Sequence, residues 1–111
     1  MKTGNVVKIQ TYCPEGHADE VRMAIGKAGG GVIGNYTYCA FLSQGHGYFL
    51  PMEGSNPAVG NIGKIEMVPE IKIEFVCERS RVKVVIEAIK KAHPYEEVPI
   101  DIIPLLDHTD H

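Results

Sequence analysis

The densest group of chemically versatile side chains is the run His93-Pro94-Tyr95-Glu96-Glu97. An imidazole next to carboxylates can hold a divalent metal ion, so His93 and Glu96 are candidate metal ligands. The same side chains suit small-molecule recognition, and we take His93, Tyr95, Glu96 and Glu97 as candidate ligand-binding residues. Proline disfavours the α conformation of the residue before it, so a helix should end at His93, where the helix dipole favours a protonated imidazole. The favoured alternative is structural: a rigid corner in which the tyrosine packs and the histidine caps carbonyl groups.

Two more places in the sequence offer candidate ligands. His46 lies between two glycines in a predicted hairpin turn, and it is the third candidate metal ligand, with an ordinary turn residue as the favoured alternative. Residues 53–64 contain three glycines, two asparagines and one proline, and are neither helix nor ordinary strand. Long irregular segments in small domains are usually functional, so we predict an arm here, with Gly54 and Asn56 as candidate ligand-binding residues. The alternative is a solvated loop.

No catalytic set can be assembled from the sequence, so we do not expect an enzyme. The three cysteines, Cys13, Cys39 and Cys77, are widely spaced and form no Cys-x-x-Cys pair. This pattern favours reduced thiols in the cytoplasm over disulfides or a structural zinc site. Cys13 and Cys77 are predicted to be buried, where thiols behave as small hydrophobic groups.

Composition limits the classes of partner. The chain has 111 residues, 44% hydrophobic and 23% charged, as expected for one globular domain, which we place at residues 1–106, followed by a flexible tail at 107–111. The net charge of −3 disfavours nucleic-acid binding. No apolar run reaches the roughly 20 residues of a membrane helix, so no membrane partner is expected.

The chain contains an internal repeat. Residues 7–28 align without a gap on residues 71–92. The matched positions include Lys8 with Lys72, Ile9 with Ile73, Cys13 with Cys77, Val21 with Val85, and Ile25 with Ile89. In both segments the apolar residues first alternate and then follow a helical stripe, which predicts a strand followed by a helix. Gly29 should end the first helix, and Ser80 should cap the second.

The remaining segments complete each half. Residues 36–43 and 48–52 predict a hairpin whose turn is Gln44-Gly45-His46-Gly47, and residues 98–105 predict an edge strand because of their prolines. The predicted fold is therefore α+β, a ferredoxin-like βαββαβ sandwich with an extended middle hairpin and arm. Two helices cover only one face of such a sheet, so the other face is either solvated or an assembly surface.

Several spaced motifs together resemble the inserted domain of the Nif-three-like (YqfO) family over residues 5–106. They are Gly34-Asn35-Tyr36, Gly45-x-Gly47-x-Phe49-x-Pro51, residues 53–57, Gly60-x-x-Gly63 and residues 93–97 followed by Pro99 and Asp101. The resemblance implies a stand-alone copy of that domain, with a PII/CutA-like fold and homo-oligomers, trimers being favoured. In longer members the domain interrupts a body with a dinuclear metal site. No residues here resemble that body, so the resemblance does not imply its metal chemistry.

Two functional interpretations follow. The first is a non-catalytic homo-oligomeric binding or regulatory module, which takes a small molecule or a partner protein between subunits near the arm and residues 93–97. The second is a CutA-type protein that binds a divalent metal ion through His93, Glu96 and His46, because the His-Pro-Tyr-Glu element also resembles one in CutA.

Overall fold

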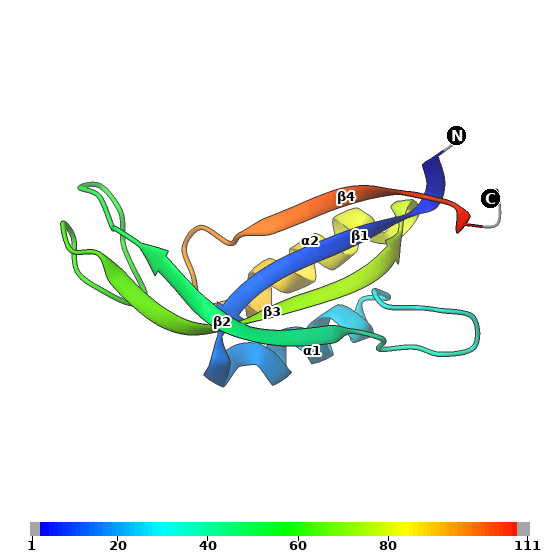
Figure 1. Cartoon of the computed structure of the whole chain (residues 1–111), viewed down its shortest axis with the longest axis horizontal. Helices are drawn as coiled ribbons and strands as arrows, with labels where there is room; N and C mark the ends of the chain where they lie inside the picture. The colour runs from blue at the N-terminus through cyan, green and yellow to red at the C-terminus, as the bar shows by residue number, and fades with distance from the viewer. Residues whose placement is uncertain (1–2, 109–111) are drawn as a thin grey trace.

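The computed structural model describes residues 3–108, so residues 109–111 of the predicted tail lie outside it. The elements follow in the order β1 (Thr3–Pro14), η1 (Glu15–His17), α1 (Ala18–Lys27), β2 (Phe41–Phe49), β3 (Glu66–Glu78), η2 (Arg79–Arg81), α2 (Val82–Ala92) and β4 (Ile100–Leu106). The strands form one antiparallel sheet in the order β2-β3-β1-β4, with both helices on one face (Figure 1). This is the predicted ferredoxin-like α+β fold, with β4 on the predicted edge.

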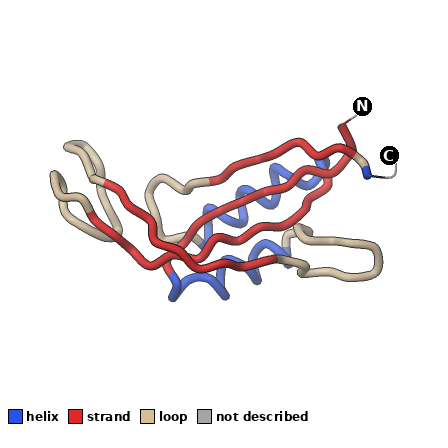
Figure 2. The backbone as a smooth tube through the Cα atoms, viewed as in Figure 1, coloured by secondary structure: helices blue, strands red, loops and turns tan. Residues whose placement is uncertain are grey.

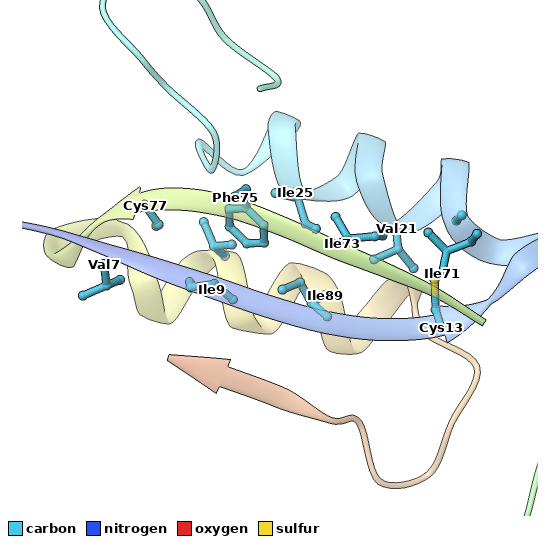
Figure 3. Close-up of a cluster of buried hydrophobic side chains, with 12 residues drawn as sticks. Val7, Ile9, Cys13, Val21, Ile25, Ile71, Ile73, Phe75, Cys77 and Ile89 are labelled. Carbon is cyan, nitrogen blue, oxygen red and sulfur yellow. The ribbon is translucent and has the colours of Figure 1, made fainter. Parts of the chain in front are cut away.

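The core lies between the two helices and the two central strands, and it follows the internal repeat. Alternate residues of β1 and β3 point toward the helices and are buried (Figure 3). Both members of each equivalent pair of the repeat are buried in this core: Ile9 and Ile73, Cys13 and Cys77, Val21 and Val85, and Ile25 and Ile89. Both halves therefore contribute the same strand face and the same helix stripe to one core. Among residues 3–108, neither helix has the length and apolar character needed to cross a membrane.

The ends of the helices confirm one prediction and contradict another. Gly29 has φ +101°, and the N–H groups of Gly29 and Gly30 bond back to the carbonyls of Gly26 and Ile25, so glycine ends α1 as predicted. Ser80 was predicted to cap α2, and this is wrong. Ser80 lies inside η2, and α2 begins after Arg81 without a side-chain cap, because the chain enters the helix through a 3-10 turn.

The predicted turn at residues 44–47 is also wrong. β2 is one continuous strand, and its pairing with β3 runs from Phe41 opposite Glu74 to Phe49 opposite Glu66. The chain reverses later, in the β2–β3 connection (residues 50–65), which contains the predicted arm and lies at the end of the molecule away from both termini (Figures 1 and 2). This long hairpin gives the molecule an elongated shape of 49 × 28 × 24 Å.

Candidate functional site

The candidate site lies where β2 and β3 leave the sheet as a two-stranded ribbon. The pairing of β1 with β3 ends at Pro14 opposite Glu70, whereas β3 continues beside β2 as far as Glu66. The corner (residues 93–97) passes the same end of the sheet on its way from α2 to β4. Three segments that are distant in sequence therefore meet here: the ribbon with its connection, the end of β1, and the corner.

His93 holds the corner to the end of β1. Its side chain is only 6% exposed, its Nε2 lies 2.6 Å from the carbonyl oxygen of Tyr12, and its Nδ1 accepts the backbone N–H of Tyr95 at 3.1 Å. Because a carbonyl can only accept, Nε2 carries the hydrogen and the imidazole is neutral. Burial lowers the pKa of His93, although the bond to Tyr12 partly opposes this effect. The expectation of a protonated imidazole at the helix end is therefore wrong, because desolvation outweighs the Tyr12 bond and the Glu70 charge that favour protonation.

Tyr95 connects the corner to the ribbon. Its hydroxyl donates to Oε2 of Glu70 at 2.7 Å. Its ring contacts those of His93 and Phe49, with centroids 4.9 and 6.0 Å away. Burial, and then the Glu70 carboxylate, raise the pKa of Tyr95, so its hydroxyl stays protonated and keeps donating.

Gly47 makes room for this contact. Gly47 lies in β2, on the same face of the ribbon as Glu70, and a Cβ atom at Gly47 would overlap the Glu70 carboxylate. At Gly45, which pairs with Glu70 in the register, a Cβ atom would meet nothing within 4 Å. The glycine at 47 therefore serves a close approach within a strand rather than the turn that the sequence predicts.

A cavity of about 590 Å³ opens between the three segments. Its walls come from β1, the end of β2, residues 50–59, Glu70 of β3 and residues 95–99. The side chains are mainly apolar and aromatic, with a few carboxylates among them. The polar lining includes Tyr12, Tyr48, Ser55, Glu70, Tyr95, Glu96 and Glu97. An apolar cavity of this size with a few convergent polar groups is typical of small-molecule sites.

Comparisons with curated proteins identify close relatives, while no family model matches the chain. The proteins named "GTP cyclohydrolase 1 type 2 homolog" of Halalkalibacterium halodurans and Bacillus subtilis are 46% and 45% identical to it, over 97% and 93% of this chain. A Bacillus cereus protein related to NIF3 has a solved structure that is 42% identical and covers 96% of this chain with a TM-score of 0.82. The chain is homologous to one part of the Nif-three-like proteins.

This homology confirms the predicted resemblance over nearly the whole of this chain, but it covers only a small part of each relative. The chain spans only 29% and 28% of the two curated relatives and 27% of the B. cereus protein. Two more distant structures share the fold alone. They are CutA from Archaeoglobus fulgidus, with a TM-score of 0.65 at 17% identity, and B. subtilis GlnK in complex with ATP, with a TM-score of 0.61 at 19% identity.

The structure brings most of the candidate ligand-binding residues of this chain together. Tyr95, Glu96 and Glu97 line the cavity. Asn56 joins them through its backbone, because its N–H donates to Oε1 of Glu96 at 3.0 Å and so ties the arm to the corner. Gly54 lies in an adjacent turn with φ +97°, where glycine is favoured, and does not form part of the cavity wall.

The candidate metal ligands do not form a cluster. His46 is exposed in β2 opposite Pro69, and both ring nitrogens of His93 have partners within the chain. Within residues 3–108, no group of three or more His, Cys, Asp and Glu side chains is placed to hold a metal ion.

Three parts of the site are not singled out by the sequence: Tyr12, Glu70 and Phe49. The spacing Gly45-x-Gly47-x-Phe49 is the available signal, but glycines between strand-forming residues equally predict a turn. Burial disfavours the reactive thiolate form of both buried cysteines. Burial, and then Glu70, raise the pKa of Cys13 to about 11, and burial also raises the pKa of Cys77.

We expect Gly47→Ala to destabilise the protein and Gly45→Ala to leave it unchanged or slightly more stable. An alanine at 47 displaces the Glu70 carboxylate and leaves the Tyr95 hydroxyl without its acceptor, a loss of about 1–3 kcal/mol. Gly45→Ala is the control. Gly45 is also a strand glycine, but open space lies beside it, so the added methyl group only reduces the freedom of the unfolded backbone. Urea unfolding of both variants measures the difference. Equal stabilities would show that Gly47 is not needed for the Glu70–Tyr95 contact.

Proposed function

We propose that this chain is a non-catalytic, homo-oligomeric binding module that takes a small molecule into the cavity between the arm and the corner. The cavity itself is the observation that carries this proposal. Its volume of about 590 Å³ is within the range of small-molecule sites, roughly 300–1,000 Å³. Three candidate residues from the corner converge on it with side chains of the ribbon, although these segments are far apart in sequence.

The arm is suited to close over a ligand. Besides its strand ends, the arm is tied to the rest of the described chain by few hydrogen bonds. Gly63 N–H donates to the Pro51 carbonyl, the N–H and hydroxyl of Ser55 donate to the Met52 carbonyl, and Asn56 N–H donates to Glu96. None of residues 50–65 belongs to the hydrophobic core. Segments with few buried apolar contacts open at low free-energy cost, so the arm can admit a ligand while the sheet stays folded.

Apolar side chains on the ribbon and its connection support assembly. Tyr48, Met52 and Ile65 are 71%, 70% and 73% exposed in the single chain, and Leu50, Ile62 and Met67 are also exposed. A concentration of exposed apolar side chains usually marks an interaction surface. We propose a homo-oligomer in which this surface is covered by other copies, with the trimer as the favoured form because of the resemblance to PII and CutA proteins.

A non-catalytic role is supported by the state of the reactive groups. The thiols of Cys13 and Cys77 are buried with raised pKa values, and both nitrogens of His93 are engaged. The activity in the relatives' name belongs to proteins more than three times as long as the matched region, so we propose that it does not reside here. Free thiols support a cytoplasmic location, as the sequence predicts.

The CutA-type alternative, with His93, Glu96 and His46 holding a divalent metal ion, stays a prediction. It requires His93 to give up one of its two hydrogen bonds, and it requires a further ligand from another subunit or segment.

Native mass spectrometry of the untagged protein tests the proposed module. We expect an oligomer that carries extra mass from a bound small molecule. Ile65→Asp places a charge on the proposed interface and should dissociate the oligomer, because burying an unpaired charge is costly. Val84→Asp is the matched control, since Val84 is also exposed, at 45%, but lies on α2. A bare monomer at micromolar concentration, or equal effects of the two substitutions, would contradict the proposed assembly.

A further inference from the structure

The cavity has a one-sided charge distribution. Three carboxylates, those of Glu70, Glu96 and Glu97, are among its lining residues, whereas no lysine, arginine or histidine of the described chain lines it. Glu70 is the most enclosed of the three, because Tyr95 binds one of its oxygens and Gly47 lies beside the other. Glu96 and Glu97 are exposed to solvent, which screens their charges, whereas Glu70 is partly buried, so the negative field inside the cavity comes mainly from Glu70.

Within residues 3–108, no ion pair neutralises these carboxylates. The ion pairs among residues 3–108 are Lys8–Glu74, Lys72–Glu74 and Arg22–Asp19, and none includes a cavity carboxylate. Glu70 receives the Tyr95 hydroxyl and Glu96 receives the Asn56 N–H, but both donors are uncharged. Glu74 provides the contrast: it lies on the same face of β3 as Glu70 and has two lysines.

The uncharged part of the wall suits an organic cation. Tyr12, Tyr48, Phe49 and Tyr95 bring aromatic rings to the cavity. The face of an aromatic ring attracts ammonium and guanidinium groups, and more strongly where water is excluded. A bare metal ion fits less well, because no cluster of three or more ligating side chains occurs among the described residues. The phosphates of a nucleotide would meet three carboxylates and no positive side chain.

We infer that the cavity binds a small organic cation, an ammonium or guanidinium group on an apolar body, with Glu70 facing the positive charge. This inference rests on the proposed function and specifies its ligand class. The aromatic rings and the connection enclose the apolar body, and Glu96 and Glu97 hold the mouth of the cavity negative. An anion of the same size and shape is rejected by the same groups.

Calorimetric titration with matched benzyl compounds tests the inference. Benzylamine and benzyltrimethylammonium are the cations, benzyl alcohol is the neutral probe, and benzoate and ATP are the anions. We expect the cations to bind at least about tenfold more tightly than benzyl alcohol, because a unit charge near a partly buried carboxylate gains more than 1.4 kcal/mol. Benzoate and ATP should show no binding to the cavity.

Glu70→Gln and Glu74→Gln form the matched pair of variants. Glutamine at 70 keeps an acceptor for Tyr95 but removes the charge. The affinity for the cations should therefore fall about tenfold or more, and the affinity for benzyl alcohol should stay unchanged. Glutamine at 74 removes a carboxylate that already has lysine partners outside the cavity, so it should change neither the affinity for the cations nor that for benzyl alcohol. If Glu70→Gln fails to fold, the exposed Glu97→Gln serves as the charge variant, with a smaller expected loss.

The outcomes separate the ligand class from the proposed function. Equal binding of benzylamine and benzyl alcohol, insensitive to either charge variant, would overturn the organic-cation inference and leave a small-molecule site in place. Tighter binding of benzoate or ATP would overturn it in favour of an anion. If no probe binds, the inference is overturned, and the retained mass in the native spectrum then decides the proposed function independently.

Discussion

Replacing His93 with alanine is expected to lower the free energy of unfolding by about 2–4 kcal/mol. The substitution leaves the Tyr12 carbonyl and the Tyr95 N–H without partners where the imidazole is now buried, and each unsatisfied buried group costs about 1–3 kcal/mol. It also removes the ring against which Tyr95 packs. Urea unfolding at pH 8 measures the loss. His46→Ala is the control, because His46 is exposed, and its effect should stay within about 0.5 kcal/mol.

The pH dependence of stability provides a second measurement on the same proteins. Burial lowers the pKa of His93 in the folded state below its ordinary value of 6.5, while the nearby Glu70 raises it and His17 lowers it. The unfolded chain therefore binds more protons between the folded pKa and 6.5, so stability is full above 6.5 and falls as the pH drops toward the folded pKa. His93→Ala should lack this component, and His46→Ala should keep it. An identical pH profile in wild type and His93→Ala would show that His93 is not buried as a neutral imidazole.

His93→Ala also tests the CutA-type alternative, in which the chain binds a divalent metal ion. Zinc or copper is titrated into the chain shortened to residues 1–106, which excludes binding by the predicted tail. If His93→Ala abolishes tight binding while His46→Ala weakens it, the CutA-type interpretation gains support. We expect neither change, because the imidazole nitrogens of His93 are already bonded to the backbone.

The fold was predictable because the apolar patterns that determine it lie within single strands and helices and occur twice in the chain. Alternation of apolar residues in β1 and β3, and the helical stripes of α1 and α2, determine which faces are buried, and the repeat supplies each pattern twice. The turn prediction failed because glycines between strand-forming residues are ambiguous. Strand position 47 needs a glycine because the Glu70 carboxylate lies against it. That contact depends on a register between two strands that sequence patterns do not reveal.

The site was predictable only in part. The corner is a compact run of unusual residues, so it could be recognised directly. Glu70 could not, because in sequence it is one of several charged residues alternating along β3, like Glu74. Only the three-dimensional structure separates them: Glu74 pairs with lysines on the open sheet, whereas Glu70 meets Tyr95 at the base of the ribbon.

Replacing the β2–β3 connection with a two-residue Asn-Gly turn is expected to abolish ligand binding and leave the domain folded. Phe49 and Glu66 are paired directly, so a two-residue turn can join the strands there. The hydrophobic core takes no residue from positions 50–65, and a shorter loop lowers the entropic cost of closure. The midpoint of thermal unfolding should therefore change little.

The loss of binding should exceed about a hundredfold, because Leu50, Met52, Pro57 and other residues of the connection form one wall of the cavity, and removing them exposes the bound ligand to water. Benzylamine titration and the mass retained in the native spectrum both measure this loss. Asn56→Ala is the control: it keeps the backbone N–H that reaches Glu96, and should bind like wild type. If the shortened protein still binds benzylamine, the ligand site lies outside this cavity. If the shortened protein does not fold, the connection is needed for folding of the domain. A folded protein that no longer binds would define the connection as the functional half of a domain whose other half is a rigid support.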